Sequence, residues 1–361
     1  MSRTTFCLLL GASLWLPAGS LAQRSFPSPY LELHDADFKT AEPLPVAPRS
    51  PVVPLARIVQ RTPTRINSLA FSRDERLLAA GKDYGRLVVW DLTSSRIFCT
   101  IDTALGSVGS LAISPDNEFI AAAAASGPSI REWHIPDGRL VSTFDNSEAN
   151  VFRLIYSRDA SLLVVGSAST EVFDTASGKL VRDFPDERDP ILSTDGSTIL
   201  TRSRSEIIFR GASDWTVKKT LPKLTDFEQP EFLDLAQGLF LFKDITDNHV
   251  FVAAHASDGQ MATEAKLADL PRAWVGIHEF AGIDPHSGLV FGHSAGQLWA
   301  LDLKTGKSCL SHQPFSEGAA LSPDGSLLAG AIDSETPTDN QKKAGIGIWK
   351  TQALIKACQM Q

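Results

Sequence analysis

The sequence predicts an all-β protein built from seven repeats of one four-stranded module. A polar turn of the form Ser-x-Asp recurs along the chain, and each copy lies between two short apolar runs typical of strands. A third run follows and carries an aromatic residue near its end. Because one such module cannot bury its own faces, it needs neighbours of the same kind.

The clearest copy of the module is Ile66–Asp91. Its first strand ends at the polar turn Ser72–Glu75. The run Leu77–Gly81 is short and continuously apolar, which favours a strand buried on both faces. A second turn at Lys82–Gly85 leads to a third strand that contains Trp90.

The first turn recurs at a regular interval, and successive copies begin 36 to 50 residues apart. They begin at Ser72, Ser114, Ser157, Ser193, Asp234, Asp284 and Ser322. The aromatic residues assigned to the third strands are Trp90, Trp133, Phe173, Phe209, Phe251, Trp299 and Trp349. A further strand, such as Leu180–Phe184, follows most of them, which gives four strands a module and seven modules in all.

This pattern resembles the WD-repeat β-propeller family, whose blades carry a Ser-Pro-Asp-Gly turn and end the third strand in Trp-Asp. In the first module the family's positions are occupied by Gly81, Asp83, Gly85, Trp90 and Asp91. The resemblance covers the chain from Leu55 to Gln352 and implies a seven-bladed β-propeller. Thr64-Arg65 replaces the family's Gly-His, and later modules lack a counterpart of Asp83. A divergent propeller of the broader quinoprotein or lactonase type therefore stays open.

Residues 55–361 are expected to form the propeller. The strand Leu55–Gln60 has no module before it, so we predict that it supplies the outermost strand of the seventh blade. Such closure removes exposed sheet edges. The final Ala353–Cys358 competes for the same position as a strand, or packs outside as a helical turn. Residues 23–54 are rich in proline and are expected to form a linker or a strap.

Residues 1–22 have the pattern of a secretory signal peptide. Arg3 supplies a positive charge, Phe6–Leu16 is apolar, and Ser20–Ala22 forms a small-x-small cleavage site before Gln23. The apolar run is shorter than the roughly 20 residues that a membrane-spanning helix needs. We therefore expect a periplasmic or secreted protein with no membrane insertion after cleavage.

Three cysteines remain after such cleavage, namely Cys99, Cys309 and Cys358. Isolated buried thiols are the first expectation for all three. An export compartment also permits a disulfide, and Cys309 with Cys358 is then the expected pair, because the repeat places both in outer strands near the end of the chain.

The charge balance argues against nucleic acid as a partner. The formal net charge is −8, and no cluster of five or more Lys and Arg residues occurs. The electrostatic footprint of a nucleic-acid-binding protein is therefore missing. Hydrophobic residues make up 43% and charged residues 21% of the 361 positions, which indicates a globular chain with ample core.

No catalytic or metal-binding motif occurs in the sequence. The histidines are scattered, without His-Glu-x-x-His or Cys-x-x-Cys spacing. The segment Gly81–Gly85 superficially resembles a phosphate loop, but it joins two strands and no helix follows it. We therefore predict no catalytic residue, no metal and no cofactor.

By the geometry of the family, the loops before each first strand and between second and third strands share one face. The sequence gathers there Asp244, Asp247, His278 and the insertion 333–343. The residues predicted to bind a partner are Arg65, Lys82, Tyr84, Arg272, Trp274 and Phe315, because exposed aromatics and arginine are enriched at interfaces.

The sequence thus favours an exported, non-catalytic scaffold that binds a protein or peptide through one face of the propeller. The alternative is a propeller enzyme of the lactonase or quinoprotein-dehydrogenase type, with calcium or a quinone in the central channel. A propeller can bring distant side chains together in that channel, so the two interpretations differ in what the channel holds.

Overall fold

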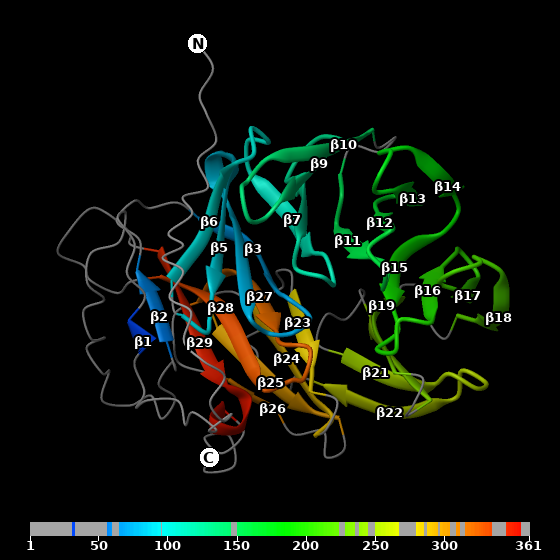
Figure 1. Ribbon diagram of the computed structural model, residues 1–361. Coiled ribbons are helices and arrows are strands. Elements are labelled where there is room, and N and C mark those ends of the chain that lie inside the picture. The colour runs from blue at the N-terminus through cyan, green and yellow to red at the C-terminus, as the bar shows by residue number, and fades with distance from the viewer. Residues whose placement is uncertain are drawn as a thin grey trace, which may run out of the picture.

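The structure is a computed structural model of the whole chain. It describes residues 31–32, 56–59, 65–94, 96–145, 150–223, 228–234, 238–244, 250–266, 279–284, 287–294, 297–303, 308–310, 315–333 and 344–354. Within these ranges the strands form seven sheets arranged around one axis (Figure 1). The predicted all-β, seven-bladed β-propeller is confirmed.

Blades 1 to 6 are each a meander of four strands. Blade 1 contains β3 (Ile66–Phe71), β4 (Leu77–Lys82), β5 (Arg86–Asp91) and β6 (Arg96–Asp102), with the 3-10 turn η1 (Asp83–Gly85) between β4 and β5. Blade 2 contains β7 (Val108–Ile113), β8 (Phe119–Ala124), β9 (Ser129–His134) and β10 (Leu140–Asp145). Blade 3 contains β11 (Arg153–Tyr156), β12 (Leu162–Gly166), β13 (Thr170–Asp174) and β14 (Leu180–Phe184).

The later blades repeat this order. Blade 4 contains β15 (Arg188–Leu192), β16 (Thr198–Arg202), β17 (Glu206–Gly211) and β18 (Val217–Pro222). Blade 5 contains β19 (Glu228–Asp234), β20 (Leu239–Asp244), β21 (Val250–His255) and β22 (Met261–Lys266). Blade 6 contains β23 (Glu279–Ile283), β24 (Leu289–Ser294), β25 (Gln297–Asp302) and β26 (Ser308–Leu310).

Blade 7 combines both ends of the described chain. Its strands are β27 (Phe315–Leu321), β28 (Leu327–Asp333) and β29 (Ala344–Lys350), with β2 (Ala56–Val59) and the two-residue β1 (Leu31–Glu32) at its edge. β2 pairs antiparallel with β29, and β1 pairs parallel with β2. Residues 351–354 form a helical turn, in agreement with one of the two alternatives for the chain end.

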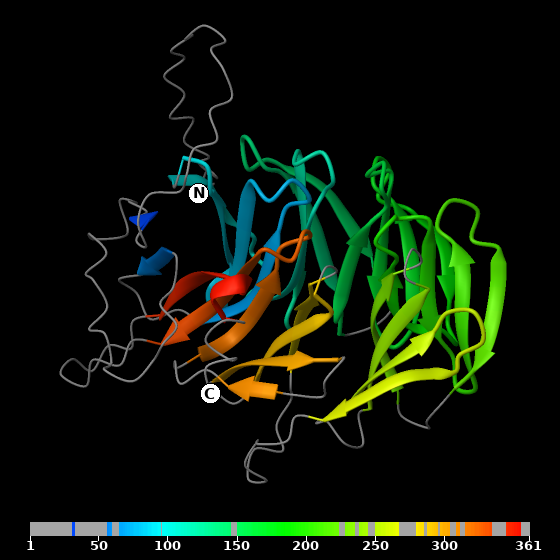
Figure 2. The same cartoon turned by 90° about the horizontal axis from the view of Figure 1, so that it is seen from below.

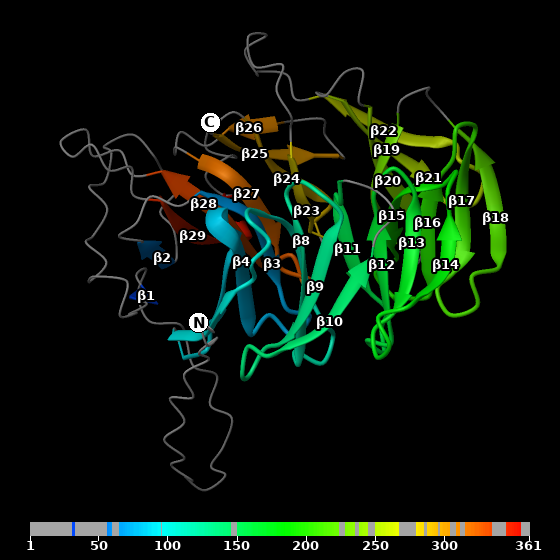
Figure 3. The ribbon, with the colours of Figure 1, turned by 90° about the horizontal axis from the view of Figure 1, so that it is seen from above.

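The first strand of each blade lies nearest the axis. These inner strands contact one another in the circular order β3, β7, β11, β15, β19, β23 and β27, and β27 contacts β3 (Figure 1). Figures 2 and 3 show the ring from its edge, with the strands at the end of the described chain beside those at its beginning.

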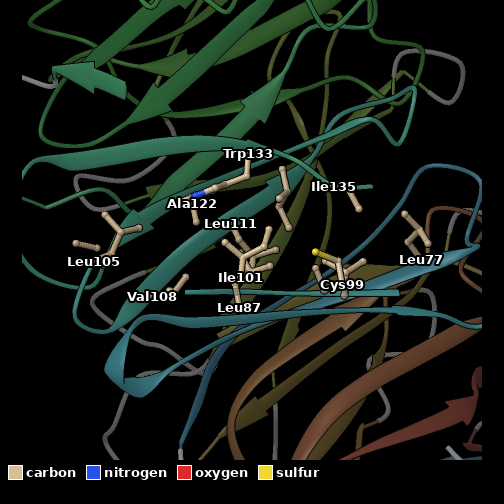
Figure 4. Packing of buried hydrophobic residues seen from close by; sticks show 14 residues of the cluster. Leu77, Leu87, Cys99, Ile101, Leu105, Val108, Leu111, Ala122, Trp133 and Ile135 are labelled. Atoms are coloured by element: carbon tan, nitrogen blue, oxygen red, sulfur yellow. The ribbon is translucent and has the colours of Figure 1, made fainter. Parts of the chain in front are cut away.

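Each blade is apolar on both faces. In β4 all six residues are buried, because alternate side chains face different neighbours. Leu78 and Ala80 pack against blade 7, whereas Leu77 and Ala79 pack against blade 2 (Figure 4). Seven such apolar clusters occur among the described residues, one at each of the seven boundaries between blades.

The Ser-x-Asp turns have the same pattern of internal hydrogen bonds. In blade 4 the Ser193 hydroxyl donates to Asp195 over 2.6 Å and accepts from the Thr198 amide over 3.0 Å. The Asp195 carboxylate also accepts from the Ser197 amide over 2.9 Å. These hydrogen bonds lower the pKa of Asp195, because they favour its ionised form. The same Ser–Asp hydrogen bond occurs in the turns that begin at Ser72, Ser114, Ser157 and Ser322.

The fourth residue of these turns adopts a left-handed backbone. It is glycine at Gly196 and Gly325, with φ of 72° and 76°, but Glu75, Asn117 and Ala160 adopt the same conformation at φ of 61°, 65° and 59°. The left-handed conformation costs an L-residue roughly 1–2 kcal/mol. Other contacts in the folded protein must therefore offset this cost at the three residues.

The outer edges of the blades carry β-bulges. The pairing of the third and fourth strands shifts register once in each of the first five blades, at the beginning of the outer strand. A bulge twists the edge and breaks the row of free backbone groups, so it disfavours pairing with another chain.

All seven aromatic residues assigned to the third strands lie in them, but only four share one register position. Trp90, Trp133, Phe173 and Trp349 occupy one equivalent position, each paired with the second residue of the preceding strand. At that position blade 4 has Arg210, blade 5 has Ala254 and blade 6 has Leu301, so Phe209, Phe251 and Trp299 lie one to three residues before it in their strands. A pattern that tolerates loops of variable length cannot fix such an offset of one to three residues.

Cys99 is buried in β6 and is disulfide-bonded, with a partner outside the described side chains. The expectation of three isolated thiols is therefore wrong for Cys99. Among the described residues, none forms a helix long and apolar enough to cross a membrane. The predicted signal peptide and most of the proline-rich segment lie outside the described residues.

We predict that Ser193→Ala lowers the free energy of unfolding by about 1–3 kcal/mol. The substitution leaves the buried amide of Thr198 without its acceptor, and an unsatisfied buried donor costs about that much. The matched variant Ser197→Ala alters an exposed hydroxyl in the same turn and should stay within about 0.5 kcal/mol. Urea denaturation followed by tryptophan fluorescence compares the two; equal losses would contradict the assigned role of Ser193.

Candidate interaction surface

The loops of the propeller are divided between its two faces. Because successive strands in a blade run antiparallel, the connections before each first strand and between second and third strands emerge at one end of the sheets. We call this end the loop face, and the opposite end, with the Ser-x-Asp turns, the turn face. Binding residues on rigid scaffolds concentrate in loops of variable sequence, so the loop face is the candidate surface.

Tyr84 is the most exposed large apolar side chain described on the molecule, at 84% of its full exposure. It lies in η1, on the loop face of blade 1, with φ 62° and ψ 23°. A left-handed conformation is costly for a bulky residue, and no burial of the tyrosine ring compensates for it. The loop therefore holds an aromatic ring in solvent at an energetic cost.

A polar network fixes the loop before Tyr84. The Asp83 carboxylate accepts hydrogen bonds from Ser107 over 2.6 Å and from Asn67 over 3.0 Å. Burial alone would raise the pKa of Asp83, but these hydrogen bonds and the charge of Arg65 outweigh it and lower the pKa. Asp83 thus stays ionised at neutral pH and joins blade 1 to blade 2. Asp83 is therefore a carboxylate that stabilises this turn.

Gly85 fixes the loop after Tyr84. Its carbonyl accepts from both the amide and the hydroxyl of Thr103, at 2.8 and 2.7 Å. Its φ is 71°, and an added Cβ would lie 3.0 Å from the Thr103 hydroxyl and 3.1 Å from the Gly106 carbonyl. Only glycine meets both requirements. Tyr84 therefore projects from a turn that is held on both sides.

Phe152 is a second exposed aromatic on the loop face. It directly precedes β11 of blade 3, and its side chain is 67% exposed, whereas the neighbouring Val151 is buried. Its amide donates to the Gly166 carbonyl over 2.9 Å, which holds its backbone against β12. Sequence reasoning missed Phe152. The sequence did carry a signal, because Phe152 directly follows Val151. Side chains alternate between two sides along an extended chain, so a buried Val151 leaves Phe152 facing solvent.

The six residues predicted to bind a partner fall into three groups: exposed, buried, and without a described side chain. Arg65 and Tyr84 are exposed and flank Asp83 on the loop face. Lys82 is only 3% exposed, and its ammonium lies 5.9 Å from the centre of the Trp90 ring, between blades 7 and 1. Its side chain is therefore not part of the exposed surface.

Arg272 and Trp274 lie outside the described residues. Phe315 begins β27, and only its backbone pairing with Ile332 is described.

A half-buried charged group occupies the equivalent position in blade 4. The Arg210 guanidinium lies 4.4 Å from the centre of the Phe184 ring and donates to the Trp215 carbonyl over 2.8 Å. It also donates to Glu187 through two nitrogens, and Thr201 donates to the same carboxylate over 2.6 Å. Every charge in this cluster has a partner, so it is a packing element rather than a site.

An ion pair spans the inner strands near the axis. Arg153 of blade 3 donates to Glu231 of blade 5 over 2.9 Å, past the inner strand of blade 4. The pair therefore joins two blades that are not neighbours, and the Glu231 side chain is buried. Within the described parts of the chain, no three His, Cys, Asp or Glu side chains are placed to hold a metal ion.

The fold and the repeat together define the class: the chain is a WD-repeat-like seven-bladed β-propeller. The WD domain, G-beta repeat family matches residues 56–91, which comprise β2 and the first three strands of blade 1. This match agrees with blade 1 as the best-preserved module.

Known proteins resemble the chain over limited stretches. WD repeat and SOCS box-containing protein 1 of Mus musculus is 28% identical over 104 residues, which are 28% of this chain and 25% of that protein. An uncharacterized WD repeat-containing protein of Synechocystis is 24% identical over 143 residues, 38% of this chain and 40% of the relative. The chain thus spans about a quarter of the length of the vertebrate relative.

A solved structure has the same fold. The β-propeller domain of Cps50 (Swd1) from Myceliophteria thermophila superposes with a TM-score of 0.64, and the alignment covers 81% of this chain and 98% of that domain. The two are 14% identical in sequence, so this likeness concerns the fold alone.

Proposed function

We propose that the protein is a non-catalytic scaffold that binds a protein or peptide through its loop face. WD-repeat propellers commonly mediate protein interactions, and the class therefore supports a binding role. The observation that carries the proposal is Tyr84, an aromatic side chain 84% exposed on a loop that two hydrogen-bond networks hold rigid.

The physical reason lies in the cost of binding. Binding is weakened when loops and side chains must become ordered in the complex, because that ordering costs free energy. A loop that is already fixed in the free protein adds less of this cost. A tyrosine ring contributes a large contact area with only two side-chain torsions. Tyr84 and Phe152 are then the apolar anchors of the proposed surface, and Arg65 contributes a positive charge beside the first.

We predict that Tyr84→Gly weakens the recovery of the bound partner without loss of stability. Glycine adopts the φ of 62° more easily than tyrosine, so the variant should unfold at the same denaturant concentration as the wild type or a higher one. Quantitative affinity purification from the exported protein fraction, with tagged wild type and variant side by side, measures the recovery. Truncation of an interface anchor typically costs about 2 kcal/mol or more, roughly 30-fold in affinity.

The matched control for this experiment is Met261→Ala. Met261 is 55% exposed on the rim of blade 5, away from the loop face, so its truncation removes apolar surface without touching the proposed site. Phe152→Ala should weaken recovery as Tyr84→Gly does. An identical set of partners for wild type and both loop-face variants would count against this face.

Export from the cytoplasm is the second part of the proposal, with residues 1–22 as a cleaved signal peptide. The disulfide at Cys99 supports an oxidising compartment, because disulfides persist there and are rare in the cytosol. We predict a mature N-terminus at Gln23, and a peptide map without reduction that joins Cys99 to Cys309 or Cys358. A bond from Cys99 to Cys7 would show that the leader stays on the chain.

We further propose that the N-terminal strand closes the propeller and that residues 23–54 form the strap that leads to it. The register of β2 on β29, from Ala56 opposite Ile348 to Val59 opposite Gly345, supports the closure. Deletion of residues 55–61 should expose the edge of β29 and abolish cooperative thermal unfolding. Unchanged melting of the deletion variant would rule the closure out.

The alternative function is a propeller enzyme of the lactonase or quinoprotein-dehydrogenase type with a group bound in its channel. Calcium would appear in metal analysis of the purified protein, and a quinone would appear in its absorption spectrum. A positive result in either measurement would favour the enzyme over the scaffold.

A further inference from the structure

One position on the third strands holds a carboxyl group in blade 2 and an apolar residue in every other blade. It directly precedes the register position of Trp90, and in blade 1 it is Val89, which packs in the cluster shared with blade 2. In blade 2 this residue is Glu132, which lies opposite Ala121 of β8. The other blades have Val89, Val172, Phe209, Ala253, Ala300 and Ile348 there.

An equally repeated position lies on the inner strands, where in blade 2 it is Ile113, which packs toward blade 1. It is the residue opposite the second residue of the neighbouring strand, and in blade 3 it is Tyr156, opposite Leu163. The other blades have Phe71, Ile113, Leu192, Leu233, Ile283 and Leu321 there. Both positions are described in all seven blades, and only the boundary between blades 2 and 3 has polar residues at them.

Glu132 and Tyr156 meet inside this boundary. The Tyr156 hydroxyl donates to Oε1 of Glu132 over 2.7 Å. The exposed fraction is 2% for Glu132 and 5% for Tyr156, and Tyr156 belongs to the apolar cluster that contains Phe144 and Phe173. A carboxyl group is thus held away from water beside a single neutral donor.

We propose that Glu132 makes the boundary between blades 2 and 3 a pH-sensitive seam of the ring, which is tight while the carboxyl group is protonated and weakens when the group ionises. The physical reason is hydration. A buried carboxylate needs ion pairs or several hydrogen bonds to replace the water that it loses, and the Tyr156 hydroxyl supplies one. The protonated carboxyl group gives up far less hydration, so it packs at a lower cost.

The elements packed around Glu132 do not compensate an ionised carboxylate. Glu132 lies opposite Ala121 on β8 and Ser142 on β10, which are both uncharged. Arg131 precedes it on β9 but donates to the Thr103 carbonyl of blade 1, on the other side of the sheet. The residues that β12 and β13 contribute to the boundary are apolar, namely Leu163, Val165 and Phe173.

The charged group that acts on Glu132 is Asp116, in the Ser-x-Asp turn of the same blade. Burial raises the pKa of Glu132, and the negative charge of Asp116 raises it further. The hydrogen bond from Tyr156 acts in the opposite direction but does not outweigh them. Burial also raises the pKa of Tyr156 well above 10, so Tyr156 keeps its proton and remains the donor.

The direction of the pH effect follows from linkage. The folded-state pKa of Glu132 lies above its ordinary value of 4.5, so its contribution to stability is fully present below pH 4.5. That contribution is lost as pH rises through the folded-state pKa. Each unit by which the folded-state pKa exceeds the ordinary value changes the unfolding equilibrium constant about tenfold.

Glu132→Gln tests the proposal, because glutamine has nearly the same shape and its carbonyl oxygen accepts from Tyr156 without a titratable proton. The urea midpoints of wild type and variant are measured at pH 5 and at pH 8, so that the groups common to both proteins cancel. We expect the midpoint of the variant, relative to that of the wild type, to rise between pH 5 and pH 8. An equal difference at the two pH values would overturn the proposal.

Two further variants separate the seam from general charge effects. Glu206→Gln removes an exposed carboxylate of blade 4 and should differ from the wild type equally at both pH values. Tyr156→Phe removes the donor to Glu132, so its midpoint should fall more between pH 5 and pH 8 than that of the wild type. The proposal fails if Glu206→Gln gains as much as Glu132→Gln, or if Tyr156→Phe falls no more than the wild type.

The double variant Glu132→Val with Tyr156→Phe gives a second reading that does not depend on a buried glutamine. It places at this boundary an apolar pair like those of the other six. We expect its midpoint, relative to that of the wild type, to rise between pH 5 and pH 8 as for Glu132→Gln. A double variant with the pH profile of the wild type would assign the effect to other groups and overturn the proposal.

Hydrogen exchange at pH 8 tests where the weakening occurs. Comparison of wild type and Glu132→Gln at one pH removes the pH dependence of the exchange chemistry itself. We expect slower exchange in the variant over 129–134 and 153–156, which are β9 and β11, and no change over 206–211 in blade 4. Uniform slowing over the chain would contradict a seam at this boundary.

Discussion

The structure depends on one constraint, which is that every blade is apolar on both faces. A sheet of this kind is stable only between two others, and seven of them satisfy the requirement by forming a ring. The alternation of β4 makes this concrete, because Leu78 contacts blade 7 while Leu77 contacts blade 2. Closure is thus a consequence of burial, and the boundary between blades 7 and 1 carries the same apolar packing as the other six.

The blades reach this packing by different means. Blades 1, 2, 3 and 7 place an aromatic residue at one equivalent position, and blade 4 places Arg210 there. A guanidinium between two sheets requires a partner, and Glu187 supplies it from the loop before the same blade. The sequence of a blade can therefore diverge widely, provided that each buried polar group remains paired.

The two faces of the ring are under different demands. On the turn face, the Ser and Asp of each turn bond to the turn itself, so the residues repeat because the local geometry repeats. On the loop face, Asp83 and Gly85 hold a turn whose central residue contacts solvent. Tyr84 is the residue there that stability does not explain, which is why the binding proposal rests on it.

The sequence by itself determined the blade count, the turns and the doubly buried strands, because hydrogen bonds and burial that act within about ten residues leave a repeating pattern. The tertiary structure decided what that pattern leaves open. It buried Lys82 over Trp90, exposed Phe152, and set Glu132 against Tyr156 inside the boundary between blades 2 and 3. These outcomes depend on how neighbouring blades face each other, and no local spacing encodes which side chains meet across a boundary.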